Sequence, residues 1–421
     1  MTNPKLGASQ MAVVALMIVL SMASYVNRTA MSIVGPEVMK EFRFSETELG
    51  SVYSALLLSY ALLMPFGGRL ADRLGPRRVL AGSTFGSGVF TVLTAVVGWA
   101  GVLISGGALM AFQAVRFALG ACAAPLYPAC ARMHAERLPR TQHARAQGLV
   151  LSGAPLGSAI TPLLLAWLMV RFGWRISFCL VGAGTALIGL FWLAWVRDSR
   201  SRDTLPAAAA SPGSRLQNWK VLFGDRNLML LSLSYFCLNY FEYIFFYWMY
   251  YYFGQVRRIA IADSAIYTSV LLLAMMVAMP LAGWFSDRLI PRLGRNVSRR
   301  LTAVGGMALS AVLLYLGTNA SGEWTMVALL ALALGLAASA EGPAWATAID
   351  AGRSQAGAAS GIMNGIGNVG GLIAPVATPW VAQWAGWTAG LYVGSAVVFV
   401  GALAWFFIDP DHSARQAAGA P

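Results

Sequence analysis

The sequence predicts an all-α integral membrane protein, with about twelve transmembrane helices in two pseudo-symmetric six-helix bundles. Three observations lead to this prediction. The 421-residue chain is 58% hydrophobic and 11% charged, whereas a soluble domain carries about 25% charged residues. Apolar stretches long enough to cross a bilayer recur along the whole chain. One charged turn motif also occurs twice, at matching places in the two halves.

Each predicted span is an apolar run of roughly 20 residues or more, enough to cross the hydrocarbon core as a helix. Helices are expected because backbone groups in lipid must find partners within their own segment. The first span is too long for a cleaved signal peptide and continues into Asn27 and Arg28 without a cleavage site. In chain order the spans are 11–34, 49–68, 79–99, 103–132, 144–170, 175–196, 227–253, 265–286, 300–318, 323–349, 356–384 and 387–408.

The longest polar interruption separates the first six spans from the last six. It covers 197–226 and includes a stretch rich in Pro, Ala and Ser at 205–213, a composition typical of a linker. We therefore predict an N-terminal six-helix bundle at 1–196, a cytoplasmic linker at 197–226 and a C-terminal six-helix bundle at 227–421.

The two halves share a sequence pattern at a nearly constant offset, which indicates an ancient duplication. The motif at 67–73, Gly-Gly-Arg-Leu-Ala-Asp-Arg, returns 215 residues later at 282–288 as Ala-Gly-Trp-Phe-Ser-Asp-Arg. Further pairs at offsets of 215 or 213 are Gly120 and Gly335, Pro128 and Pro343, Gly148 and Gly361, Gly157 and Gly370, Pro162 and Pro375, and Trp174 and Trp387.

The net charge of +13 is explained by membrane orientation and requires no nucleic acid or other acidic partner. With both termini in the cytoplasm, most Lys and Arg residues fall in cytoplasmic loops and tails, as the positive-inside rule expects for a plasma (inner) membrane protein. Those on the opposite side are Lys40, Arg43, Arg171, Arg175, Arg257 and Arg258, and those inside spans are Arg28 and Arg116.

The sequence shows no arrangement of residues suited to catalysis or cofactor binding. The four cysteines fall in apolar spans, where buried thiols are expected rather than disulfides. The three histidines are expected in cytoplasmic loops or the tail, so no metal site or cofactor is predicted. No nucleophile–base pair and no phosphate-binding loop occurs, so an enzyme and an ATP-driven pump are both disfavoured.

The loop at 67–78 resembles the signature loop of the major facilitator superfamily. The surrounding pattern resembles one branch, the anion:cation symporters, relatives of sialic acid and vesicular glutamate carriers and of bacterial sugar-acid transporters. This resemblance covers nearly the whole chain apart from the tails and the linker. It is carried by Tyr25–Thr29, Arg116, Pro125–Pro128, Glu341–Trp345 and Gly361–Gly371.

The resemblance implies secondary active transport of a small organic anion, with protons as the coupling ion and a site near the membrane midplane between the halves. It also implies substrate-binding residues. These are Arg28, Arg116, Tyr25, Tyr60, Trp345, and Asn364 or Asn368. The chain departs from the branch at Asn27 and Ala123, where members often have acids linked to proton coupling. An uncoupled or sodium-coupled carrier therefore remains an alternative.

The two arginines inside spans are candidates on physical grounds as well. A charge near the bilayer centre costs about 2.5–3.5 kcal/mol on insertion scales, so it is usually functional or paired. Arg28 would lie roughly 25 Å along its span from the cytoplasm and Arg116 roughly 18 Å from the outside. A guanidinium can hold a carboxylate through two hydrogen bonds. The alternative is a structural pairing of each arginine with another helix.

Two acids inside the spans are candidates for proton coupling. Glu242 occupies the repeat-equivalent position of Asn27, so the titratable group is expected in the opposite half. Glu341 lies beside Gly342 and Pro343, where the helix can bend. A buried carboxyl group can take up a proton on one side of the membrane and release it on the other. The alternatives are a structural pair for Glu242 and a gate or packing contact for Glu341.

The repeated motif also predicts conformational gating. Asp72, within reach of Arg132, would stabilise one state of the cytoplasmic face and release the other. The candidate gating residues are Asp72, Arg73, Arg132, Asp287 and Arg288. The alternative is that these loops only follow the positive-inside rule. The aromatic run at the end of the seventh span, 243–253, is expected to form an interfacial belt or, through Tyr243, Tyr247 and Tyr250, to line an outer vestibule.

Three other functions are less favoured. A proton-antiport exporter of drugs or metabolites is second, because two arginines in spans favour anions over lipophilic cations. A transport-like sensor lacks a signalling domain, and a channel does not fit the duplicated plan. A monomer is expected, and the residues leave open which anion is carried and in which direction.

Overall fold

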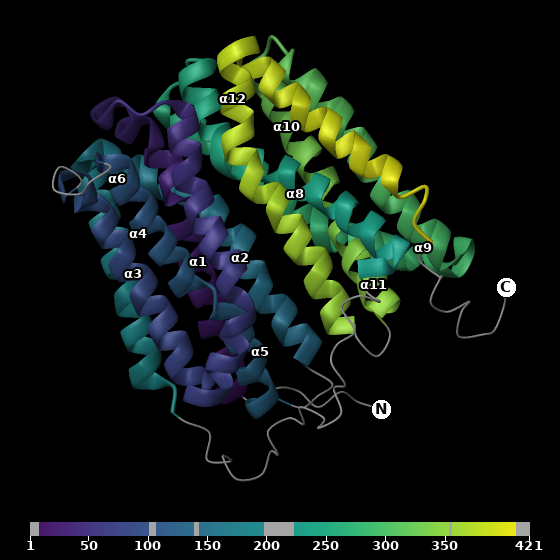
Figure 1. The fold of residues 1–421 in the computed structure, drawn as a ribbon, viewed down its shortest axis with the longest axis horizontal. Coiled ribbons are helices and arrows are strands. Elements are labelled where there is room, and N and C mark those ends of the chain that lie inside the picture. The colour runs from purple at the N-terminus through teal and green to yellow at the C-terminus, as the bar shows by residue number, and fades with distance from the viewer. Residues whose placement is uncertain (1–7, 101–106, 139–142, 198–222, 353–355, 410–421) are drawn as a thin grey trace. The chain divides into compact units, whose positions relative to one another are not determined.

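The computed structural model describes residues 8–100, 107–138, 143–197, 223–352 and 356–409. The chain divides into two compact units, Met1–Ser211 and Pro212–Pro421. The division falls within the range predicted as the linker. Figure 1 shows that the described part of each unit consists of long helices, as the fold-class prediction requires.

Unit 1 contains six labelled helices, the first of which runs past the end of the predicted span. They are α1 (Ala8–Phe42), α2 (Glu46–Leu74), α3 (Pro76–Ala100), α4 (Gly107–Ala123), α5 (Leu126–Arg137) and α6 (His143–Trp195). Unit 2 contains α8 (Arg226–Tyr251), the π-helical turn η2 (Tyr252–Val256), α9 (Ile261–Thr318), α10 (Glu323–Ala338), α11 (Glu341–Gly352) and α12 (Ala356–Ala404).

Two of the apolar stretches are too long to be single spans. Ala146–Trp195 and Ala359–Ala404 contain 50 and 46 residues, about 70 Å or more as straight helices, against a hydrocarbon core of about 30 Å. Each is interrupted by a glycine with left-handed backbone, Gly173 (φ 78°) and Gly386 (φ 81°). Both glycines lie in the predicted gaps between spans. The ten apolar stretches of the described chain therefore account for the twelve predicted spans.

The fourth span of each half consists of two helices, whereas the sequence predicted only a possible bend beside Gly342 and Pro343. Helix α4 ends at Ala123 and α5 begins at Leu126, while α10 ends at Ala338 and α11 begins at Glu341. Pro128 and Pro343 are each the third residue of the new helix. A proline in the first turn loses no helical hydrogen bond, whereas in a continuous helix it would lose one. The prolines therefore explain both breaks.

Two glycines allow the first helix of each unit to approach a later one closely. A Cβ atom on Gly157 would lie 2.4 Å from the carbonyl oxygen of Met22, and one on Gly370 would lie 2.2 Å from that of Phe236. Such distances are possible only without a side chain, as is usual where transmembrane helices pack backbone to backbone. These contacts hold α6 against α1 and α12 against α8, next to the candidate site residues.

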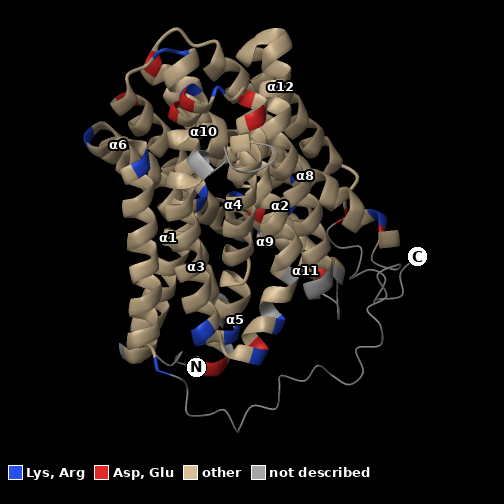
Figure 2. Ribbon diagram, turned by 60° about the vertical axis from the view of Figure 1, so that its left-hand side comes forward, with Lys and Arg blue, Asp and Glu red and all other residues tan. Residues whose placement is uncertain are grey.

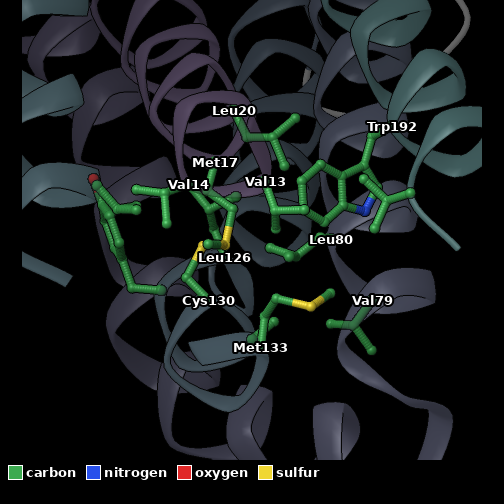
Figure 3. Close-up of a cluster of buried hydrophobic side chains, with 14 of the residues drawn as sticks. Val13, Val14, Met17, Leu20, Val79, Leu80, Leu126, Cys130, Met133 and Trp192 are labelled. Carbon is green, nitrogen blue, oxygen red and sulfur yellow. The ribbon is translucent and has the colours of Figure 1, made fainter. Parts of the chain in front are cut away.

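A buried apolar cluster in unit 1 holds the short helix α5 in place. Figure 3 shows Leu126 and Met133 of α5 among side chains of α1, α3 and α6, including Val13 and Trp192. Many other large apolar side chains are exposed instead; Trp384, for example, is 81% exposed. Exposed apolar surface on the spans is what a lipid environment requires.

Charged residues lie mainly at the helix ends. Figure 2 shows long uncoloured stretches along the helices and blue and red residues near their termini. The repeated motif at 67–73 belongs to the final turns of α2, which ends at Leu74, rather than to a loop as predicted. Inside the spans, charges are few, and they form the candidate sites.

Candidate functional site

In unit 1, the candidate site is centred on Arg28 of α1. The guanidinium carbon lies 5.1 Å from the ring centroid of Tyr25 and 5.2 Å from that of Tyr60, within the range of a cation–π contact. Its Nη1 also donates to the Tyr25 hydroxyl at 3.4 Å. Tyr25 is one helical turn before Arg28, and Tyr60 belongs to α2. The structure thus brings together three of the predicted substrate-binding residues.

A small pocket lies beside these residues, with a volume of about 10 Å³, room for about one water molecule. Arg28 is the charged residue in its lining and is 8% exposed. The lining residues are Ser24, Tyr25, Asn27, Arg28, Leu56, Tyr60, Ser87, Leu119, Ala123 and Tyr127. At this size the pocket admits no organic acid in this conformation. It places a guanidinium beside hydroxyl groups and aromatic rings, an arrangement that favours hydrogen bonding to an anion.

Arg116 of α4 is not part of this lining. It is fully buried, and its guanidinium donates to two backbone carbonyls of α1, those of Asn27 at 3.1 Å and Arg28 at 2.8 Å. These contacts tie α4 to α1 beside the arginine that faces the pocket. The predicted anion contact of Arg116 stays a prediction, and the geometry supports a positioning role.

Asn27 uses its amide group within unit 1. Its Nδ2 donates to the carbonyl of Ala23 at 2.8 Å and to the hydroxyl of Thr185 on α6 at 2.9 Å. Its Oδ1 is buried without a hydrogen-bond partner in the described part of the chain. An amide cannot carry a proton, so this position cannot supply the titratable group that the resemblance implies.

In unit 2, Glu341, Trp345 and Tyr235 form a hydrogen-bonded cluster. The Tyr235 hydroxyl donates to Glu341 Oε2 at 2.8 Å. The Trp345 indole nitrogen lies 3.1 Å from the same oxygen and 3.0 Å from the Tyr235 hydroxyl. The two rings meet edge to face, with centroids 6.3 Å apart. Sequence reasoning missed Tyr235, although Tyr235, Asn239 and Glu242 recur at helical spacing along one face of α8.

Glu242 of α8 is 3% exposed, and its Oε1 has no hydrogen-bond partner among the described residues. Glu341 is close enough to act on it electrostatically. Two carboxyl groups thus lie near each other inside a membrane-spanning unit. One of them has two donors, and the other has a buried oxygen without any.

Asn364 and Asn368, the predicted amides of α12, are both partly exposed. Asn368 Nδ2 donates to the backbone carbonyl of Asn364 at 2.8 Å and to its Oδ1 at 3.2 Å. Between them, Gly367 packs against the ring of Tyr235, so this part of α12 adjoins the cluster in unit 2.

The candidate gating residues have different surroundings. Arg132 Nε lies 3.4 Å from Asp72 Oδ1, which links α5 to the end of α2, and 3.3 Å from Glu136 Oε1. Arg73 is exposed, and Arg288 lies over the Trp284 ring at 5.1 Å. The side chain of Asp287 lies outside the described residues. Their gating role stays a prediction.

Unit 2 has a corresponding ion pair, which sequence reasoning missed. Asp350 of α11 accepts from Arg299 of α9 at 2.7 Å and lies 3.5 Å from Arg295. It links the broken fourth span of unit 2 to a neighbouring helix, as Asp72 and Arg132 do in unit 1. The signal that could have indicated it is a lone acid near basic residues at the predicted cytoplasmic ends.

The aromatic run of α8 does not form an exposed belt. Tyr243, Tyr247, Trp248 and Tyr250 are all buried within unit 2, so this interpretation was wrong, because the helix packs against α12 along its length. His134 is likewise buried in α5 rather than in a loop. The four cysteines are free, and the described residues contain no cluster suited to a metal ion.

The sequence matches the family described as Major Facilitator Superfamily over residues 16–350 and again over 289–421. The chain belongs to the major facilitator superfamily. This result confirms the predicted family and fold class. It also confirms that the protein is a multi-pass membrane transporter and not an enzyme.

Several relatives of this superfamily member have names that describe organic-acid transport. The chain is 28% identical to the probable sulfoacetate transporter SauU of Cupriavidus necator, covering 92% of this chain and 91% of that protein. It is 27% identical to the probable galactarate/D-glucarate transporter GudP of Escherichia coli, covering 76% and 75%. It is 26% identical to the hexuronate transporter of Bacillus subtilis, covering 73% and 72%.

The fold resembles a solved crystal structure, that of a bacterial homolog of the human lysosomal transporter Spinster in an inward-facing and occupied conformation. The TM-score is 0.79 at 15% identity, covering 96% of this chain and 97% of that chain. At this identity the likeness shows the fold alone.

Proposed function

We propose that this superfamily member carries a small organic anion of the carboxylate or sugar-acid type, together with protons, by alternating access. The names of its relatives support the substrate class. The observation that carries the proposal is Arg28, a guanidinium that lines a pocket inside a membrane-spanning bundle. We place the protein in the inner membrane with both termini in the cytoplasm, as the charge distribution indicates.

Arg28 is suited to receive the acid group of the substrate. The rings of Tyr25 and Tyr60 hold the guanidinium in place, and their hydroxyl groups add donors for anion oxygens. Arginine can present two parallel N–H groups to a carboxylate, which fixes the orientation of the anion as well as its position. A lysine at the same place would keep the charge but lose this paired contact.

Glu242 is suited to carry the proton. A buried carboxylate oxygen without a donor costs several kcal/mol, and Glu242 Oε1 has no donor among the described residues, so this environment favours the neutral form of the carboxyl group. Glu341 has two donors and is stabilised as a carboxylate by them. Because Asn27 and Ala123 replace acids of unit 1, we assign proton coupling to unit 2, with Glu341 as the charged partner of Glu242.

The Asp72–Arg132 pair and the broken fourth spans supply the conformational part of the proposal. Helix α5 is a short segment with its own buried cluster, and the ion pair attaches it to α2. An exposed ion pair is weak, worth about 0–1 kcal/mol. It can therefore break and re-form during each transport cycle without a large barrier.

The test is uptake of labelled organic acids by purified protein in liposomes, with and without an inward proton gradient. We expect saturable uptake that the gradient accelerates. Arg28→Lys should raise KM at least about tenfold, because a paired charge-assisted contact is lost. Arg78→Lys, an exposed arginine at the start of α3, is the matched control.

Proton coupling is tested separately with Glu242→Gln. This variant should still bind and exchange the anion but lose acceleration by the gradient, whereas the exposed Glu323→Gln should retain it. Gradient-driven accumulation by Glu242→Gln would remove Glu242 from the mechanism. Saturable uptake that ignores the gradient in the parent protein would instead indicate an uncoupled or sodium-coupled carrier.

A further inference from the structure

We propose that Glu341 selects the substrate by charge, so that the transporter takes monoanionic polyhydroxy acids and discriminates against acids with a second anionic group. The inference rests on the proposed function, because it names the class of organic anion that is carried. The relatives do not decide this point, since their names include both kinds of acid.

The carboxyl group of Glu341 is held in a defined position. It is the first residue of α11, directly after the break in the span, where an acid is favoured by the helix dipole. The Tyr235 hydroxyl and the Trp345 indole both point at Oε2, at 2.8 and 3.1 Å. These donors come from α8 and from the next turn of α11, so the carboxyl group is fixed from two sides.

The second oxygen of Glu341 is available to a substrate. Among the described residues no group donates to Oε1, and the side chain as a whole is partly exposed. A carboxylate is an acceptor only. A hydroxyl group that reaches it can therefore donate a hydrogen bond, while a carboxylate or sulfonate meets a like charge.

The two donors on Oε2 favour the charged form of Glu341 over that of Glu242. By contrast, Glu242 has a buried oxygen without a donor. A single proton shared by the two groups is therefore best placed on Glu242. Proton binding and selection by charge are then performed separately by two neighbouring acids.

The surroundings of Glu341 suit a polyhydroxy chain. Tyr235 and Trp345 present perpendicular aromatic rings with centroids 6.3 Å apart, and the partly exposed amides Asn364 and Asn368 lie on the helix that packs against Tyr235. Apolar walls with a few fixed polar groups are the usual composition of a small-molecule site. A sugar acid offers both C–H faces and hydroxyl groups to such walls.

The test uses galactonate and galactarate, which have the same carbon chain and differ only in a terminal hydroxymethyl or carboxylate group. Each competes, unlabelled, against uptake of labelled galactonate by the parent protein in liposomes. We expect galactarate to compete at least about tenfold more weakly, because like charges placed together are strongly disfavoured. In Glu341→Gln the difference should shrink to less than about threefold, since the repelling charge is gone.

Two further variants complete the design. Tyr235→Phe keeps the ring but removes one donor from Glu341. It should therefore reduce the difference between galactonate and galactarate as competitors only in part. Glu323→Gln is the matched control, because Glu323 Oε2 also accepts from a tyrosine hydroxyl, that of Tyr267 at 2.9 Å, but at an exposed position. It should leave the ratio of the two acids unchanged.

The outcomes separate this inference from the proposed function. Saturable uptake in which galactarate competes as well as galactonate, with no effect of Glu341→Gln, would overturn charge selection while leaving the anion transporter intact. Failure of both acids to compete with any labelled organic anion, in a protein that takes up none, would refute the proposed function itself. If Glu341→Gln does not fold, the ratio of galactonate to galactarate competition in Tyr235→Phe decides whether Glu341 selects by charge.

Discussion

Arg116 is predicted to act on stability more than on substrate affinity, in contrast to Arg28. Its guanidinium donates to the carbonyls of Asn27 and Arg28 at 3.1 and 2.8 Å and is fully buried. In Arg116→Lys the charge remains, but a single ammonium group cannot reproduce the forked contact to two adjacent carbonyls. One hydrogen bond to a charged group is then lost.

The size of the effect follows from that lost contact. Hydrogen bonds to charged groups contribute about 1.5–3 kcal/mol, so we expect a loss of about 2 kcal/mol in the free energy of unfolding. For a unit of roughly 200 residues this lowers Tm by roughly 4–8 °C. The KM for the transported anion should change by less than about threefold, because the arginine does not line the pocket.

Two assays on the same preparation decide the question. Thermal unfolding in detergent gives Tm, and uptake in liposomes gives KM, each for Arg116→Lys, Arg28→Lys and the exposed control Arg78→Lys. A rise in KM for Arg116→Lys as large as that for Arg28→Lys, with Tm unchanged, would refute the positioning role. That result would support the prediction from the sequence that Arg116 contacts the anion directly.

Two further predictions concern packing and gating. Gly370→Ala should lower Tm by several degrees, because its Cβ would lie 2.2 Å from the Phe236 carbonyl oxygen and overpacking costs about 1–3 kcal/mol. The control is Gly361→Ala on the same helix, which should leave Tm unchanged because there is open space around its Cβ. Equal Tm values for the two variants would contradict the close approach of the helices. Asp72→Asn should change the maximal uptake rate while leaving Tm within about 2 °C, since Asp72 is 63% exposed and an ion pair with an exposed partner adds little stability. An unchanged rate would exclude a role in gating.

Much of the fold could be predicted because membrane spans leave a strong signal. Apolar length alone located the spans, and the turns at Gly173 and Gly386 fall in the predicted gaps. The break at Ala124–Pro125 was missed, and near Ser339–Ala340 only a possible bend was predicted, because hydropathy does not change where a helix is interrupted inside the bilayer. Pro128 and Pro343, each three residues after the break, were visible in the sequence, but only the helix boundaries show that they lie in the first turn of a new helix.

The candidate site was harder to predict than the fold. Arg28, Tyr25 and Tyr60 could be found because a charge in an apolar span is rare and the family pattern names its neighbours. Tyr235 could not, since one more tyrosine in an aromatic-rich helix carries no signal until its hydroxyl is seen against Glu341. The contacts of Arg116 were equally hidden, because backbone carbonyls leave no trace in a sequence.

Comparison of the two repeats explains why the site chemistry differs from the branch pattern. The helix breaks and the close glycine contacts recur at equivalent positions in both units, so the backbone framework has been kept. The polar side chains have not been kept: the position of Arg28 is occupied in unit 2 by Tyr243, and that of Asn27 by Glu242. The cation and the acid therefore stand on corresponding turns of α1 and α8.

This distribution has a consequence for coupling. In a unit that holds both an arginine and an acid, the two groups can neutralise each other, and the anion must compete with the acid for the guanidinium. The function proposed above assigns anion binding to Arg28 of unit 1, and assigns proton binding and charge selection to Glu242 and Glu341 of unit 2. Moving the acid back, as in the double variant Asn27→Asp with Glu242→Gln, should restore acceleration by a proton gradient if only the position of the titratable group has changed. Continued loss of coupling in that variant would mean that unit 2 contributes more than a carboxyl group.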